Sequence, residues 1–156
     1  MEKHDEVLIA LRQIIRAIDM HSKRLIKEAG LTAPQLLLLK GINELGQISM
    51  RQLANHTNMS QATATTIMDR LESRQLVERV RSQTDKRKVH ATLTEQGRQL
   101  LSNAPTPLQD HFIQRFQALE GWEQTLLLSS LQRISHMMNA SDIDAAPVLS
   151  VNPLTD

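Results

Sequence analysis

The segment from Ile48 to Leu93 is the feature that most constrains how this chain of 156 residues can fold. Its pattern predicts a short helix, a turn, a second helix, and then two strands joined by a basic turn. Small polar side chains open the second helix, and the basic turn contains Lys86, Arg87 and Lys88. Such a helix can enter the major groove of DNA, and a cationic ribbon can reach the neighbouring minor groove. The segment is therefore typical of a DNA-reading module.

The composition favours packed helices and excludes several kinds of chemistry. Hydrophobic residues make up 40% of the chain and charged residues 22%, as in soluble globular proteins, but aromatic residues make up only 2%. The scarcity of aromatic rings argues against a protein that stacks on splayed-out bases of single strands or RNA loops. The chain contains no cysteine, which excludes disulfides, thiolate metal sites and thiol-based redox sensing.

The charge of the chain is concentrated rather than large. The formal net charge is +1, which is too small for general coating of a polyanion. Between Asp69 and Lys88, however, seven Lys or Arg residues face four Asp or Glu residues, so this segment carries +3 and the remainder about −2. A local basic patch on a nearly neutral body is the pattern expected of a site-specific DNA binder.

Other classes of protein are disfavoured by missing motifs. No apolar run approaches the length of a membrane span, and the first residues lack the apolar core of a signal peptide, so we expect a cytoplasmic, nucleoid-associated protein. The six histidines show no metal-binding spacing, and neither a glycine-rich phosphate loop nor a nucleophile elbow is present. We therefore expect no metal, no cofactor and no enzymatic activity.

Helix and strand boundaries are marked by capping residues. The run Leu36–Leu39 is apolar nearly all round and predicts a buried helix, whereas Pro105 and Pro107 should kink or break a later helix. The other boundaries follow the same rules: a helix over 5–29 ended by Gly30; helices starting at Thr32, Ser49, Ser60, Thr94 and near Gly121; strands over Leu76–Arg81 and Lys88–Leu93.

These boundaries predict a mainly α fold: a winged helix-turn-helix with a small antiparallel hairpin over residues 31–100. Residues 1–30 and 105–140 would form a helical dimerisation region, and residues 141–156 an extended or disordered tail. The terminal helices are apolar along one side and need a partner, for which a second copy of the chain is the simplest choice. A two-fold dimer predicts a palindromic DNA site.

The helix that follows Ser60 contains the candidate base-reading residues. Threonine is a poor helix former, yet three threonines occur among its first six positions. Glutamine can contact adenine, and a threonine methyl can contact a thymine methyl. The alternative is a merely solvated face. The candidates are Gln61, Ala62, Thr63, Thr65 and Thr66, opposite an expected inward stripe of Ala64, Ile67, Met68 and Leu71.

The turn between the two strands is the second candidate site. By itself, a run such as Lys86-Arg87-Lys88 is usually a solvated turn, but here it follows a candidate recognition helix. A guanidinium at Arg87 can enter a narrow minor groove, where the negative potential is enhanced. Asp85 would repel phosphate, so we expect a structural role in which it pairs with Arg81 or Arg87.

The chain resembles the MarR family of winged-helix regulators, the multiple-antibiotic-resistance-regulator type. The matching segments are LTAPQLLLLKGINE, ISMRQLANHTNMSQATATTIMDRLESRQLVERV and DKRKVHATLTEQG. The family's wing signature corresponds here to Asp85, Arg87, Leu93, Thr94 and Gly97. The resemblance implies a homodimer with interlocking terminal helices, Arg87 as the wing arginine, and groove-facing positions at Gln61 to Thr66 and Arg70; the capping residue Ser60 is counted with the DNA-binding residues. One departure is Gln75, where the family commonly has glycine, so a positive φ is expected at a non-glycine residue.

The resemblance also implies a function and an effector. It predicts a double-stranded DNA-binding transcriptional regulator, and we expect a repressor. Members often bind a small, commonly aromatic anion, for which the candidates by position are Met20, His21, Arg24, His111 and Phe112. The alternative for these five is a place in the dimer core or on the surface. The alternative for the whole chain is a winged-helix protein-interaction module that has lost its DNA face.

Overall fold

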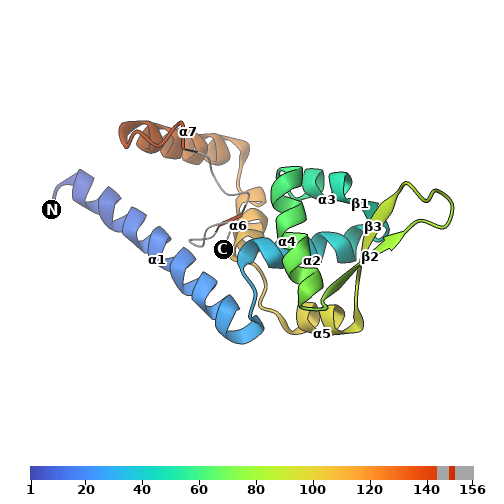
Figure 1. Ribbon diagram of the computed structural model, residues 1–156. Coiled ribbons are helices and arrows are strands. Elements are labelled where there is room, and N and C mark those ends of the chain that lie inside the picture. Colours follow the sequence, from blue (N-terminus) through green and yellow to red (C-terminus); the bar gives the residue numbers. More distant parts are fainter. Residues whose placement is uncertain (144–147, 150–156) are drawn as a thin grey trace. The chain divides into compact units, whose positions relative to one another are not determined.

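The computed structural model describes residues 1–143 and 148–149, which fall into two compact units (Figure 1). The first unit comprises Met1–Pro105 together with the chain from Pro147, and the second comprises Thr106–Ala146. The first contains α1 (Lys3–Ala29), α2 (Ala33–Leu45), β1 (Ile48–Ser49), α3 (Met50–His56), α4 (Gln61–Ser73), β2 (Val77–Arg81), β3 (Val89–Leu93) and α5 (Glu95–Asn103). The second contains α6 (Leu108–Gln117) and α7 (Gly121–Met137). The mainly helical fold with a small antiparallel sheet is confirmed.

The expected caps start and end the helices of the first unit. The Thr32 hydroxyl accepts a hydrogen bond from the Gln35 backbone N–H at 3.4 Å, and the Gln35 side chain accepts one from the Thr32 N–H at 3.0 Å. Ser49 and Gln52 repeat this capping box at α3. Helix α1 ends at Gly30, which adopts a φ of 63°, a left-handed conformation that favours glycine.

The sheet has the strand order β1-β3-β2, and both pairings are antiparallel. Strand β1 was not predicted, because two residues are too few to show an alternating pattern. The strand predicted over Leu76–Arg81 begins one residue later in the structure, where β2 starts at Val77. Leu76 is buried ahead of β2, so Val77 points into the core and Glu78 faces outward. Because Val77 and not Glu78 lies on the buried face of β2, no charged side chain is placed in the core at this position.

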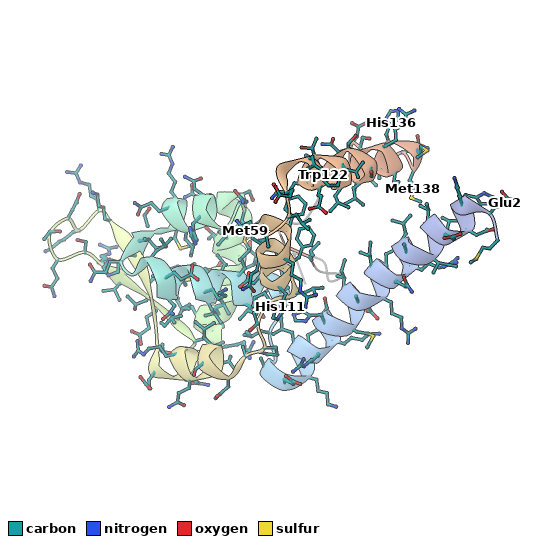
Figure 2. The ribbon with its side chains drawn as sticks, turned by 180° about the vertical axis from the view of Figure 1, so that it is seen from behind. Glu2, Met59, His111, Trp122, His136 and Met138 are labelled. Atoms are coloured by element: carbon teal, nitrogen blue, oxygen red, sulfur yellow. The ribbon has the colours of Figure 1, made fainter. Side chains whose placement is uncertain are left out.

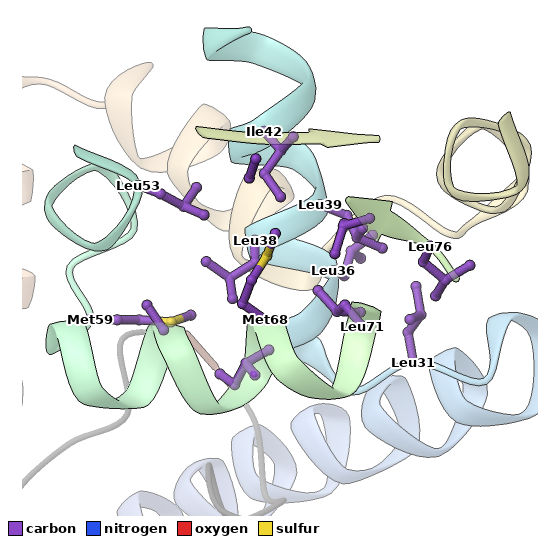
Figure 3. Close-up of a cluster of buried hydrophobic side chains, with 14 of the residues drawn as sticks. Leu31, Leu36, Leu38, Leu39, Ile42, Leu53, Met59, Met68, Leu71 and Leu76 are labelled. Carbon is purple, nitrogen blue, oxygen red and sulfur yellow. The ribbon is translucent and has the colours of Figure 1, made fainter. Parts of the chain in front are cut away.

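The core of the first unit lies between α2, α4 and the sheet (Figure 3). Leu36, Leu38 and Leu39 of α2 are almost completely buried, which confirms that this helix is interior. The expected stripe of α4 is also buried and holds that helix against α2. Val148 of the tail is buried with the same core. The rest of the predicted tail, over 144–147 and 150–156, lies outside the described residues.

Helix α1 is buried only near its end. Leu25 and Ala29 belong to the core, whereas Val7, Ile14 and Ile15 are exposed although they are large and apolar. The helix therefore carries an apolar stripe well beyond the part that the first unit covers. Among the described residues, no helix combines the length and apolar character needed to cross a membrane.

The second unit begins where prolines interrupt the helix. α5 ends at Asn103 and α6 begins at Leu108, so the expected break at Pro105 and Pro107 is confirmed. The Gln124 side chain joins α7 to the end of α6 by donating to the carbonyls of Phe116 and Leu119, each at 3.1 Å. Large apolar side chains remain exposed along α7, including Trp122 near its start and Met138 at its end (Figure 2).

Candidate nucleic-acid interface

The turn before α4 sets the direction of the candidate recognition helix. Asn58 adopts a φ of 55°, and the Met59 N–H donates to the carbonyl of Ala54 at 2.9 Å. Burial of Ile67 and Met68 then fixes the rotation of α4 about its axis. The opposite face is open to solvent: Gln61, Ala62, Thr66 and Asp69 are exposed, and Thr63, Thr65 and Arg70 are half-buried.

Hydroxyl groups at the start of α4 compensate for its poor helix formers. The Ser60 Oγ accepts a hydrogen bond from the Thr63 N–H at 3.1 Å and donates to the Thr63 Oγ1 at 2.8 Å. The Thr66 hydroxyl donates to the carbonyl of Ala62 at 3.0 Å. Ser60 and Thr63 therefore serve the helix cap, and the exposed amide of Gln61 is the better placed group for a base edge.

The wing, the loop from Ser82 to Lys88 between β2 and β3, has a shape fixed by Asp85. Its Oδ1 accepts a hydrogen bond from the Arg87 N–H at 3.1 Å and lies 3.7 Å from the Arg87 Nε. The loop closes where the Ser82 N–H donates to the Lys88 carbonyl at 2.8 Å. Of the two arginines considered, Asp85 thus pairs with Arg87, whereas Arg81 is exposed on β2.

The wing tip presents three cations to solvent. The Arg87 side chain is 96% exposed despite its contact with Asp85, and Lys86 and Lys88 are exposed on either side of it. An exposed ion pair of this kind contributes little to stability because water and salt screen it. The Arg87 guanidinium is therefore available to a ligand, while the backbone of Arg87 is held in place by its hydrogen bond to Asp85.

Arg79 of β2 makes contacts with α4 that the sequence did not reveal. Its Nη2 lies 2.5 Å from the Asp69 Oδ1 and its Nη1 lies 3.6 Å from the Glu72 Oε1, so it ties the wing strand to α4. The pairing also offsets the negative charge of Asp69 on the exposed face of α4. Opposite charges on either side of a turn were the only signal, and nothing in their spacing shows that they meet.

The signature Leu93-Thr94-x-x-Gly97 has a structural role. The Thr94 hydroxyl donates to the Gln75 carbonyl at 2.7 Å and accepts from the Gly97 N–H at 3.0 Å. A Cβ at Gly97 would lie 2.0 Å from the Leu76 carbonyl oxygen, so only glycine allows this approach. Gln75 itself has a φ of 60°, which confirms the expected positive value at this non-glycine residue.

The ligand candidates lie in both units. His111 and Phe112 line a pocket of about 360 Å³ within the second unit, together with Arg115, and the Phe112 and Phe116 rings stack at 5.4 Å. Met20, His21 and Arg24 lie on α1 in the first unit, where Arg24 pairs with Glu28. Among the described residues, no cluster of His, Asp and Glu is arranged to hold a metal ion.

An exposed polar helix after a tight turn, followed by a basic wing on a three-stranded sheet, defines a winged helix-turn-helix DNA-binding protein. The family model of the MarR family matches residues 31–89. The transcriptional regulator HosA of Escherichia coli O111:H- is 31% identical over 133 residues, which cover 84% of this chain and 96% of HosA. The chain belongs to the MarR family and is a DNA-binding transcriptional regulator rather than an enzyme.

Two further proteins illustrate the similarity. The homoprotocatechuate degradative operon repressor of Escherichia coli is 25% identical over 135 residues, or 86% of each chain. The solved structure of BpsR from Bordetella bronchiseptica has a TM-score of 0.54 and 27% identity, and the match covers 83% of this chain and 98% of BpsR. The DNA binding of BpsR is described as regulated by 6-hydroxynicotinic acid.

Proposed function

We propose that this chain is a transcriptional repressor that binds a palindromic operator as a homodimer in the cytoplasm, and that a small ligand or a change in solution conditions relieves the repression. The observation that carries the proposal is that α4 and the wing belong to one unit, where Arg79 fixes one against the other. A helix and a wing held in a fixed relation can occupy adjacent grooves of the same duplex.

The dimer is proposed from the unsatisfied apolar faces. Ile14 and Ile15 of α1 are 50% and 59% exposed, and Trp122 and Leu131 of α7 are 68% and 49% exposed. Large apolar side chains left exposed along a helix are unfavourable in water, and a partner surface that covers them would remove that cost. A two-fold dimer formed through these helices, with residues 1–30 and 105–140 as its dimerisation region, would present two copies of α4 to the two halves of a palindrome.

Each DNA-binding residue has a proposed role. Gln61 and Thr65 read base edges in the major groove, with Ala62 and Thr66 allowing close approach of the helix. Ser60 and Thr63 shape the start of α4, and Arg70 contacts the DNA backbone. Arg87 enters the minor groove, and Lys86 and Lys88 neutralise phosphates. The exposed positions of Gln61 and the three wing cations support these assignments.

Ligand control is proposed from the candidate residues and from BpsR, whose DNA binding is described as regulated by 6-hydroxynicotinic acid. Arg115 and His111 beside stacked rings offer charge and apolar surface to a small aromatic anion. Arg24, His21 and Met20 remain candidates through the resemblance of the chain to its family.

The proposal is tested by selecting duplexes from a random-sequence library with the full-length protein. Mobility shifts are then measured on the duplex that is most enriched, called the selected duplex. The selected duplex should contain a palindrome and bind at least a thousandfold more tightly than a scrambled duplex of the same composition. Equal binding to both, or no binding, would contradict the proposal and favour a winged-helix module that contacts proteins instead.

A further inference from the structure

One arginine joins the ends of two helices that are far apart in the sequence. Arg74 follows α4 directly, at its C-cap, and its Nη1 donates a hydrogen bond to the carbonyl oxygen of Gly30 at 2.7 Å. Gly30 is the residue that ends α1. The recognition helix is therefore attached to the end of α1, the helix whose earlier turns carry the exposed apolar side chains of Val7, Ile14 and Ile15.

The local geometry makes this contact specific. Gly30 is held by its own N–H, which donates to the Ile26 carbonyl at 2.9 Å, and by its left-handed φ of 63°. A Cβ at Gly30 would lie 3.3 Å from the Arg74 Nη2, so the guanidinium lies directly against the glycine. A charged planar donor forms a stronger hydrogen bond to a carbonyl than a neutral group does, and its fork shape restricts the angle of approach.

The two ends of α4 are under different constraints. At the start of α4, the Ser60 hydroxyl bonds to Thr63 and the Thr66 hydroxyl to Ala62, so these side-chain hydrogen bonds stay within the helix and its cap. The later turns are tied twice: Arg79 joins Asp69 and Glu72 to β2, and Arg74 joins the helix end to α1. The tilt of α4 thus depends on both the wing and α1.

We propose that Arg74 is a positioning residue that couples the placement of α1 to the placement of the recognition helix, and so sets discrimination between DNA sequences. The inference rests on the proposed function, in which α4 reads DNA and α1 lies in the dimer interface. A shift of α1 would then move the end of α4 through a single hydrogen bond, without any change in the residues that touch bases.

The binding test compares Arg74→Met, which keeps the length of the side chain but cannot donate, with Arg74→Lys, which retains one donor to Gly30. Gln99→Met is the control, since Gln99 is an exposed residue on α5 that has no part in the proposed DNA contacts or the proposed dimer. Affinities are measured at several salt concentrations on the selected duplex and its scrambled partner. Arg74→Met should lose about tenfold in the ratio of the two affinities, in keeping with one charge-assisted hydrogen bond. Arg74→Lys should recover part of the loss, and the control should match wild type.

The salt dependence separates positioning from direct DNA contact. If Arg74 neutralised a phosphate, Arg74→Met would weaken both duplexes alike and reduce the slope of log affinity against log salt by about one unit. A positioning residue leaves that slope unchanged. A reduced slope, or an unchanged affinity ratio, would overturn the inference.

A measurement without DNA tests the coupling itself. Because the chain has no cysteine, spin labels can be attached to Lys27→Cys on α1 and Ala62→Cys on α4 alone. The distance distribution between the labels should be broader in Arg74→Met than in wild type or Gln99→Met, with Arg74→Lys between them. An unchanged distribution would overturn the inference. If wild type fails to discriminate between duplexes, the proposed function fails, and the label distances still decide whether Arg74 positions α4.

Discussion

The guanidinium of Arg79 on β2 lies 2.5 Å from the carboxylate of Asp69 on α4, across the turn that separates the recognition helix from the wing. Only 27% of the Arg79 side chain is exposed, although Asp69 is 59% exposed. The pair therefore connects α4 to the wing strand β2 at a partly shielded position. It also keeps a carboxylate on the exposed face of α4 from acting as an unpaired negative charge.

Breaking this pair should affect DNA binding more than stability. Arg79→Met and Asp69→Asn should each lower the free energy of unfolding by about 0.5–1 kcal/mol, since half of the pair is exposed to solvent. Chemical denaturation of both single variants and the double variant gives the coupling energy. Affinity for the selected duplex should fall in both single variants. A coupling energy of zero together with wild-type affinity would remove Arg79 from the interface.

The contact between Gly97 and the Leu76 carbonyl should be intolerant of any side chain. A Cβ 2.0 Å from a backbone oxygen forces α5 away from the start of β2, so Gly97→Ala should destabilise the protein by about 3 kcal/mol or more. Gly121→Ala is the matched control, because a Cβ there meets nothing within 4 Å. Thermal unfolding should show a large loss for the first variant and none for the second. Equal melting temperatures would contradict the proposed role of Gly97.

The wing arginine should act on DNA without supporting the fold. Arg87→Ala removes a side chain that is 96% exposed, so its melting temperature should match wild type. Affinity for the selected duplex should fall by about 1–3 kcal/mol per site, by analogy with good base contacts. Titration of both proteins on the same duplex checks this. An affinity that does not change would exclude the wing from the mechanism.

The apolar faces of α1 and α7 should be covered by a second copy. Sedimentation at micromolar concentration should give a dimer, and Leu131→Glu, at a side chain that is 49% exposed, should shift the population toward monomer. Gln132→Glu is a control at a neighbouring exposed position of the same helix. A folded wild-type monomer under these conditions would contradict the proposed dimer.

The parts of the fold that follow local rules could be predicted from the sequence. Capping at Thr32, Ser49 and Ser60, the left-handed end at Gly30, and the proline break before α6 depend on residues close together in the chain. The positive φ at Gln75 was expected only from the family resemblance. The missing parts depend on contacts between distant residues. Strand β1 exists because Ile48 pairs with Ala91, and no pattern in two residues shows that.

The candidate site divides in the same way. The sequence alone shows the polar residues at the start of α4 and the cations at the wing tip. It does not show which side chains hold α4 and the wing in place. Arg74 and Arg79 looked like ordinary surface arginines until the fold placed one beside Gly30 and the other beside Asp69. Partners separated by a turn, or by 44 residues as Gly30 and Arg74 are, follow no period, so the sequence alone could not pair them.

In the proposed function, α4 reads DNA sequence, whereas the wing lysines supply affinity that does not depend on sequence. The most direct measurement is the affinity of four alanine variants for the selected and scrambled duplexes over a range of salt concentrations. Lys86→Ala and Lys88→Ala should weaken both duplexes about equally and reduce the salt slope by about one unit each. Gln61→Ala and Thr65→Ala should weaken only the selected duplex and leave the slope unchanged. If these two variants weaken binding to both duplexes alike, or weaken binding to neither, α4 does not read DNA sequence.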